Sequence, residues 1–415
     1  MMSEHCYLLT GASGFLGHEM LRAIARTDPE ARVYATLRAP VGELDSRANA
    51  LGWRGVAPRV VPICADLTRV RAGLSPRDVE RVTAEVTHVV HAGASVRFDD
   101  AIHRARQVNV VGTQSLLEVA RRMRRLERFV HVSTAFVCGD RPGALLEGPA
   151  PPGRFRNTYE RSKFEAEEAV QRAMASLPIT IVRPSIVGPA LTREGRADGV
   201  DVASATGDGP GNGLAQRTPQ GSDESRARFL LLLRIYLTHG WRWVPGTPSS
   251  LVDLVPVDLV GRATVALAHR PLSDGRWYNL AAGPRASTVR ALGDIASRTF
   301  RVPPLSFAPP RLFRAAMRMF VWGRARPALE RAAPYVPYLS VRTRIDTTDS
   351  QRVLRELGIE MPRVDELFTA LLAQLHPVAA GVRSAQPLAD TRPPARFSAS
   401  RARAAGLPRP AERRS

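Results

Sequence analysis

The sequence contains a single lysine, Lys163, although lysine and arginine together account for 59 of its 415 residues. Arginine therefore supplies every other fixed positive side-chain charge, and the formal net charge is +20 at pH 7. Such a surface attracts acidic ligands, including nucleic acids and phosphate-bearing small molecules. The arginines are spread along the whole chain among acidic and apolar residues, so we do not expect a nucleic-acid-binding protein. A phosphate-bearing cofactor or substrate fits this charge better.

Cysteine is also scarce. The three cysteines, Cys6, Cys64 and Cys138, are odd in number and widely separated. Their spacing fits neither a metal site nor a disulfide framework. We therefore expect free thiols in a reducing cytosol and no bound metal.

Long hydrophobic runs are absent. The most apolar stretch, residues 229–237, is interrupted by Arg234 and falls far short of the roughly 20 residues that cross a bilayer. The first residues lack the basic and apolar pattern of a signal peptide, so we expect a cytoplasmic protein. A helix expected at 311–326 is both apolar and basic. It fits domain packing, but it also leaves open a peripheral contact with the inner face of a membrane.

The first 190 residues alternate between apolar runs and amphipathic stretches. This alternation predicts an α/β fold, a Rossmann-type doubly wound parallel sheet. The expected strands are 5–10, 32–38, 59–67, 87–94, 128–137 and 179–187, and the expected helices are 14–26, 103–123 and 158–174. We expect a dinucleotide-binding domain at 5–190 completed by 251–281, a flexible loop at 193–227, a smaller and mostly helical substrate-binding part at 228–250 and 282–377, and a disordered Arg/Pro-rich tail at 378–415.

The segment TGASGFLG follows the first expected strand and opens the first expected helix. It places Gly11, Gly14 and Gly17 where a dinucleotide site needs a tight turn, a close approach of the pyrophosphate and tight helix–strand packing. Unpaired amides at the helix N-terminus then favour the phosphates. Ser13, Phe15 and Leu16 belong to the same loop and complete the predicted phosphate site.

The second expected strand ends in Arg38 with no acidic residue nearby. A site for NAD usually ends this strand with Asp or Glu on the ribose hydroxyl, whereas a guanidinium suits the additional phosphate of NADP. NADP is therefore favoured over NAD. Asp66, after the third expected strand, is a candidate partner for the adenine amino group.

The segment YERSK places Tyr159 and Lys163 four residues apart, on one face of the expected helix. A free phenol has a pKa of about 10 and transfers protons poorly at neutral pH. A nearby ammonium group should lower that pKa by Coulomb attraction. An arginine cannot replace the compact, rotatable donor of lysine, which could explain why this position alone keeps lysine.

The fifth expected strand ends in two small hydroxyl residues, Ser133 and Thr134. Either hydroxyl could hydrogen-bond a substrate carbonyl oxygen as it gains negative charge. The residues alone leave the choice between them open.

Several motifs together resemble the extended short-chain dehydrogenases/reductases, and most closely the fatty acyl-CoA reductase and thioester reductase branch. They are the glycine loop and the segments HAGASVRF, NVVGT, VSTAFVCG, NTYERSKFEAE, RPSIVGP and LVDLVPVDLV. The resemblance implies a catalytic group of Thr134, Tyr159 and Lys163, with Lys163 also contacting the cofactor. It further implies cofactor contacts from Leu67, Ala92, Gly93, Ala94, Pro184 and Ile186.

The resemblance implies NADPH-dependent reduction of a fatty acyl thioester, bound to CoA or to a carrier protein on another polypeptide, to an aldehyde or an alcohol. Two alternatives stay open. One is a reductase or dehydrogenase of a sterol, a ketone or a nucleotide sugar, and the other is a non-catalytic NADP-binding regulator. A homodimer is also left open.

Overall fold

The computed structural model describes residues 5–57, 59–191, 243–272, 276–308 and 333–373. The predictions for 193–227, 229–237, 311–326 and 378–415 lie outside these residues.

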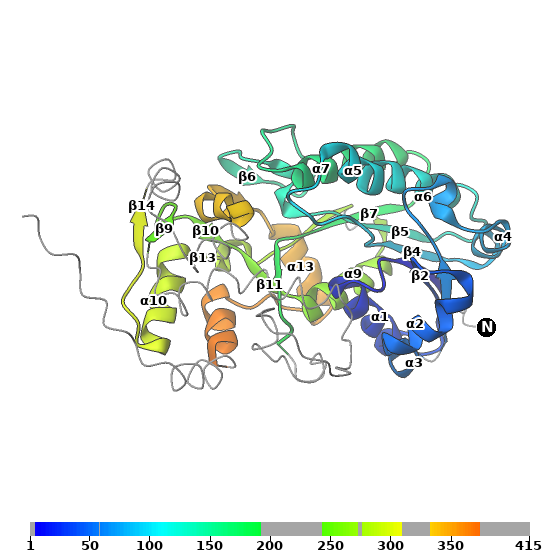
Figure 1. Ribbon diagram of the computed structural model, residues 1–415, viewed down its shortest axis with the longest axis horizontal. Helices are drawn as coiled ribbons and strands as arrows, with labels where there is room; N and C mark the ends of the chain where they lie inside the picture. The colour runs from blue at the N-terminus through cyan, green and yellow to red at the C-terminus, as the bar shows by residue number, and fades with distance from the viewer. Residues whose placement is uncertain (1–4, 58, 192–242, 273–275, 309–332, 374–415) are drawn as a thin grey trace, which may run out of the picture. The chain divides into compact units, whose positions relative to one another are not determined.

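Seven parallel strands form one central sheet (Figure 1) in the order β12-β7-β5-β4-β1-β2-β3. The strands are β1 (Cys6–Thr10), β2 (Arg32–Leu37), β3 (Val60–Cys64), β4 (His88–His91), β5 (Arg128–Val132), β7 (Ile179–Pro184) and β12 (Trp277–Leu280). From β1 the chain first adds β2 and β3 on one side of β1, and then returns to add β4 and β5 on the other side. The topological switch point, where such folds bind ligands, therefore lies between β1 and β4. The predicted Rossmann-type sheet is confirmed.

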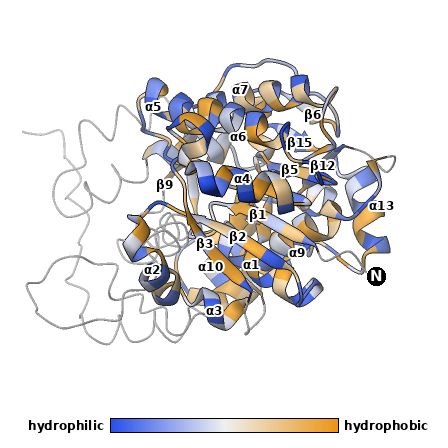
Figure 2. Cartoon of the chain, turned by 90° about the vertical axis from the view of Figure 1, so that its right-hand side faces the viewer, coloured by the Kyte–Doolittle hydropathy of each residue, from blue (hydrophilic) through white to orange (hydrophobic). Residues whose placement is uncertain are grey.

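Helices cover both faces of this sheet, as Figure 1 shows. One face packs against α1 (Phe15–Thr27), α2 (Leu44–Ala50), α3 (Trp53–Val56), α9 (Val257–Ala268) and α13 (Thr348–Glu356), and the other against α4 (Pro76–Glu85), α6 (Gly112–Ala120) and α7 (Thr158–Ala173). The strands are buried on both sides, which explains their nearly continuous apolar sequences. Figure 2 shows this hydrophobic character on β1 and β2.

The helix expected at 103–123 contains an irregular turn. It begins as α5 (Ile102–Arg106), passes through a π-helical turn, η3 (Gln107–Val111), and continues as α6. Single π-helical turns inside α-helices are often found at functional sites. This one places Asn109 in the core, with only 1% of its surface exposed.

Short strand pairs join segments that are distant in the sequence. They are β6 (Gly143–Leu145) with β15 (Thr343–Ile345), β8 (Ile186–Gly188) with β11 (Leu254–Pro256), β9 (Trp243–Pro245) with β14 (Ser306–Ala308), and β10 (Leu251–Val252) with β13 (Ser287–Thr288). Beside them lie α10 (Val289–Phe300) and a 3-10 helix, η8 (Ala333–Ser340). In the described residues of the smaller part, helices are thus accompanied by four short strands that the sequence did not indicate: β9, β13, β14 and β15. None of the described helices is both long enough and apolar enough to cross a bilayer.

Candidate active site

The glycine loop packs tightly against the end of β4. Gly11 has a φ of +73°, and a Cβ there would lie 2.7 Å from the backbone nitrogen of Gly93. A Cβ on Gly17 would lie 2.0 Å from the carbonyl oxygen of Gly11. Gly11 therefore requires glycine because of its positive φ, and neither Gly11 nor Gly17 has space for a Cβ atom. The loop leaves a backbone-lined cradle at the switch point of the sheet.

The N-terminus of α1 faces this cradle. Gly14 is its N-cap residue, and no side chain caps the helix. The amide of Gly14 donates to the carbonyl of Gly11 at 2.9 Å, which closes the turn. A helix end without a side-chain cap, joined to a glycine turn, suits the pyrophosphate of a dinucleotide in both charge and space. The residues present therefore fit the predicted cofactor. Ser13 lies in the same turn, and Phe15 and Leu16 are the first two residues of α1.

Asp66 and Arg38 are the residues predicted to contact the adenine end of the cofactor. The Oδ1 atom of Asp66 accepts hydrogen bonds from the amide and the hydroxyl of Thr68, at 3.0 and 2.7 Å. These bonds lower the pKa of Asp66, and the charges of Arg38 and Arg69 lower it further. Arg38 is exposed directly after β2. The structure thus brings the guanidinium and the carboxylate close enough to interact.

The loop after β4 is held by Asn109, whose role the sequence did not reveal. Its Oδ1 accepts from the amide of Ser95 at 2.7 Å, and its Nδ2 donates to the carbonyl of Ser95 at 3.0 Å and to the hydroxyl of Ser162 at 2.9 Å. A Cβ on Gly93 would lie 2.9 Å from Cδ1 of Leu67. Leu67, which follows β3, therefore lies beside the predicted cofactor residues Ala92, Gly93 and Ala94, and Asn109 ties the loop that carries these three to helix α7.

Thr134 and Tyr159 meet at the end of β5. Thr134 caps η4 (Ala135–Cys138) by accepting from the amide of Phe136 at 3.3 Å, and its hydroxyl lies close enough to the phenol of Tyr159 to lower the pKa of that phenol. Tyr159 lies in the first turn of α7, whose N-cap residue is Asn157. Two hydroxyls from distant segments thus lie together beyond the carboxyl end of the sheet.

Ser133 points elsewhere. Its hydroxyl donates to Oε2 of Glu167 at 2.5 Å, and Glu167 forms a buried ion pair with Arg183. This contact holds β5, α7 and β7 together in the core. Of the two hydroxyls that the sequence left open, Thr134 is the one beside Tyr159.

Lys163 lies one turn further along α7 and is almost fully buried, with 3% of its surface exposed. Its ammonium group donates to the backbone carbonyl of Val132 at 2.7 Å and lies 3.5 Å from Nε2 of His131. Burial lowers the pKa of Lys163 to about 8, although the nearby Glu167 acts in the opposite direction. The group therefore remains mainly charged at pH 7 and is held against the end of β5, two residues before Thr134.

One electrostatic expectation, a lowered pKa for Tyr159, is wrong. Burial raises the pKa of Tyr159 to about 12, the hydrogen bond from Thr134 opposes this, and the charge of Glu160 adds to it. The cost of burying a phenolate is the largest of these effects, and it outweighs the lowering that the sequence predicts. The phenol is fully protonated at neutral pH, which is the form that a proton donor requires.

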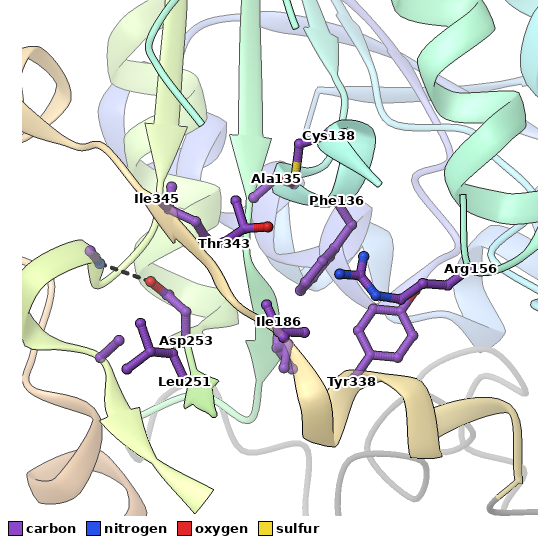
Figure 3. Close-up of a pocket in the computed structure, with 13 residues that line it drawn as sticks. Ala135, Phe136, Cys138, Arg156, Ile186, Leu251, Asp253, Tyr338, Thr343 and Ile345 are labelled. Atoms are coloured by element: carbon purple, nitrogen blue, oxygen red, sulfur yellow. Dashed lines mark hydrogen bonds between the residues drawn. The ribbon is translucent and has the colours of Figure 1, made fainter. Parts of the chain in front are cut away.

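A pocket opens beside this group (Figure 3). Ala135 and Phe136, which directly follow Thr134, form one side of it. Most of its lining is apolar, and the charged members are Arg156 and Asp253. The lining residues are Ala135, Phe136, Cys138, Arg156, Ile186, Leu251, Asp253, Gly283, Ala286, Tyr338, Val341, Thr343 and Ile345. Ile186, a predicted cofactor-side residue, thus also lines the pocket, and Pro184 ends the neighbouring strand β7.

The sheet order, the glycine loop at its switch point, and the grouping of Thr134, Tyr159 and Lys163 define a Rossmann-type protein with a site of the short-chain dehydrogenase/reductase kind. Residues 9–264 match the NAD-binding family described as "Male sterility protein". The chain belongs to this family, and the resemblance inferred from its motifs is confirmed.

Curated relatives include "Fatty acyl-CoA reductase 2" of Mus musculus, which is 31% identical over 315 residues. That match covers 65% of this chain and 56% of the mouse protein. "Fatty acyl-CoA reductase 1" of Xenopus laevis is 28% identical over 313 residues, with 66% of this chain and 54% of that protein covered. The chain thus matches little more than half the length of these relatives.

Among solved structures, the terminal R domain from the myxalamid PKS-NRPS biosynthetic pathway superposes with a TM-score of 0.69. It is 26% identical, and the match covers 92% of each chain. A thiolation-reductase di-domain from an archaeal non-ribosomal peptide synthetase has a TM-score of 0.65 at 20% identity, covering 91% of this chain and 76% of that one. The second likeness supports the fold alone.

Proposed function

We propose that the protein reduces the thioester carbonyl of a fatty acyl group, carried by CoA or by a carrier protein, with NADPH as the reductant. The observation that supports the proposal is the pair of hydroxyls, Thr134 and Tyr159, at the carboxyl end of β5, where the next residues, Ala135 and Phe136, line a mostly apolar pocket. The names of the relatives in the sequence and structure comparisons agree with this chemistry.

The bound dinucleotide would supply the hydride to the carbonyl carbon. Thr134 and Tyr159 donate hydrogen bonds to the carbonyl oxygen, which gains negative charge in the transition state. Tyr159 then transfers its proton to that oxygen, which gives a hemithioacetal. The hemithioacetal then collapses: its hydroxyl proton returns to the Tyr159 phenolate, the C–S bond breaks to leave the aldehyde, and the departing thiolate takes up a proton from solvent. A second reduction at the same site would give the alcohol.

The pocket suits an acyl chain better than a nucleotide sugar. Both of its charged side chains already have partners. Arg156 donates to Glu160 and to the carbonyl of Gly139, while Asp253 accepts from the amides of Ala282 and Gly283. Among its described lining residues, no unpaired cation is available for a diphosphate. Burial also raises the pKa of the Cys138 thiol in this lining, so direct reduction is favoured over a covalent acyl-cysteine.

The proposal is tested by following NADPH oxidation with palmitoyl-CoA and with a carrier-bound acyl thioester, and by identifying the aldehyde or alcohol by mass spectrometry. UDP-glucose, a sterol ketone and a simple ketone serve as competing substrates. Tyr159→Phe is the control, since it keeps the ring but has no proton to give. Turnover of a nucleotide sugar or ketone, with none of any thioester, would refute the acyl assignment.

We further propose that Arg38 binds the additional phosphate of NADP. The Arg38→Ser variant should lose about 10- to 100-fold in kcat/KM for NADPH, the range expected for a lost charge-assisted hydrogen bond. Its kcat/KM for NADH should stay nearly unchanged. Arg54→Ser, which removes an exposed arginine paired with Asp45, is the matched control. An unchanged ratio of NADPH to NADH activity in Arg38→Ser would show that the site does not select NADP through this residue.

A further inference from the structure

We propose that Tyr338, a residue 179 positions beyond Tyr159, is a positioning residue that holds the first turn of α7 in its working geometry and links it to the substrate pocket. The inference rests on the proposed function for its kinetic consequences only. Its structural part, the coupling of Tyr338 to Tyr159, can be measured without turnover.

The ring of Tyr338 is fixed by packing. Tyr338 belongs to η8, and only 9% of its surface is exposed. Its ring stacks on Phe98 at 5.3 Å between centroids and meets the edge of Phe136 at 5.0 Å. The guanidinium of Arg156 lies 5.7 Å from the ring centroid. Because Phe98 also contacts Tyr159, at 5.6 Å, one aromatic cluster joins the segment 333–340 to the proposed proton donor.

The hydroxyl of Tyr338 links two residues at the start of α7. It accepts from Nδ2 of Asn157 at 2.9 Å, and it lies close enough to the carboxylate of Glu160 to lower the pKa of that group. Asn157 in turn accepts from the amide of Glu160 at 2.9 Å, as the N-cap of the helix. Tyr159 lies between Asn157 and Glu160 in the sequence, so its backbone is held on both sides by partners of Tyr338.

The carboxylate of Glu160 makes this arrangement costly to disturb. It is fully buried, with 0% of its surface exposed. It accepts from the backbone amide of Arg156 at 2.9 Å and from the guanidinium of Arg156 at 3.2 Å. A buried charge needs all its partners, because an unpaired one carries a large desolvation penalty. Loss of the Tyr338 hydroxyl would leave Glu160 and the Asn157 amide each without one partner.

The same residues form part of the pocket wall. Tyr338, Arg156 and Phe136 all line it, and Figure 3 shows the Tyr338 ring beside Arg156, facing Phe136. A substrate that shifts η8 would therefore act on Glu160 and Asn157 through the Tyr338 hydroxyl. This places Tyr338 between substrate contact and proton transfer, without contact between Tyr338 and the reacting atoms.

The decisive variant is Tyr338→Phe, which keeps the ring and removes the hydroxyl. We expect kcat to fall about tenfold, with KM for the thioester changed less, because a small displacement of Tyr159 affects the chemical step. The acid limb of the kcat–pH profile should move to higher pH. The reason is that burial already raises the pKa of Glu160, while the Tyr338 donor lowers it. Tyr335→Phe is the matched control, since it removes a hydroxyl from the same helix beside the same Phe98.

A double-mutant cycle separates positioning from simple loss of stability. Glu160→Gln removes the carboxylate charge that lies beside the Tyr338 hydroxyl. Tyr338→Phe should therefore lower kcat by a smaller factor in the Glu160→Gln background than in the wild type. Additive losses in kcat would overturn the proposal. An unchanged acid limb in Tyr338→Phe would do the same.

The measurement that needs no turnover is the NMR signal of the Tyr159 phenol carbon. The chain has only seven tyrosines, so 13C-tyrosine spectra can be assigned with Tyr159→Phe. The signal should shift in Tyr338→Phe and stay in place in Tyr335→Phe. If the wild type reduces no thioester but this shift occurs, the proposed function fails and the coupling stands. If the signal does not move, the coupling itself is refuted.

Discussion

The Lys163→Arg variant is expected to lose about 10³-fold in kcat/KM, near the middle of the range for a group that supports proton transfer. The Lys163 ammonium lies in the core, donating to the carbonyl of Val132 at 2.7 Å. The arginine side chain is longer than that of lysine, and its planar guanidinium is larger than an ammonium group. It therefore cannot occupy the volume of the Lys163 side chain without moving β5 or α7. Because Thr134 follows β5 and Tyr159 lies on α7, either movement separates the two hydroxyls.

The pH profile adds a second readout for Lys163. Its pKa is lowered from the usual value to about 8, so the ammonium form is complete well below pH 8 and is lost as the pH rises above it. Activity that needs the ammonium should therefore decline around pH 8, far below the pKa of about 12 for Tyr159. In Lys163→Arg any residual activity should lack this decline, because arginine stays protonated.

Arg161→Lys is the matched control for this variant. It exchanges the same two residue types on the same helix, at an exposed position paired with Glu165. We expect it to change kcat/KM less than twofold. A Lys163→Arg enzyme that keeps wild-type activity, with NADPH bound and the fold intact by circular dichroism, would contradict the catalytic role of Lys163.

The sequence predicted the central sheet well because its strands are long, buried on both faces and separated by helices. Residues 129–132, for example, are apolar except for His131, and they form most of β5. The short pairs β6–β15 and β9–β14 could not be predicted in the same way. A segment of three residues carries no measurable periodicity, and its partner is fixed only by tertiary packing.

The residues of the candidate site also fall into two groups: those in local sequence motifs, and those brought together only by tertiary packing. Gly11, Gly17, Thr134, Tyr159 and Lys163 stand in local motifs, so the sequence identified them. The partnership of Tyr338 with Asn157 joins residues 181 positions apart, and no local pattern indicates it. One local signal was available, since Asn157 followed by Glu160 has the spacing of a helix N-cap with its acidic third residue. The pKa of Tyr159 was misjudged because burial, which raises it, depends on the whole fold.

The Gly17→Ala variant should abolish measurable NADPH binding, with an expected loss in affinity of at least about 100-fold. The added Cβ would lie 2.0 Å from the carbonyl oxygen and 2.6 Å from the carbonyl carbon of Gly11, and 2.9 Å from the Cα of Ala12. These are backbone atoms of the phosphate turn, so they cannot move aside as a flexible side chain would. Relieving the contact pushes α1 away from the turn, and the helix N-terminus then no longer faces the phosphates.

The measurement for Gly17→Ala is a titration followed by NADPH fluorescence, together with the shift in Tm that saturating NADPH produces. Gly55→Ala is the control, because a Cβ at Gly55 in helix α3 would meet nothing within 4 Å. That variant should bind NADPH like the wild type, since alanine is at least as good as glycine in a helix. The Tm of unliganded Gly17→Ala should fall by several degrees, because overpacking of this kind costs about 1–3 kcal/mol. Wild-type affinity in Gly17→Ala would mean that the dinucleotide phosphates bind somewhere other than the glycine cradle.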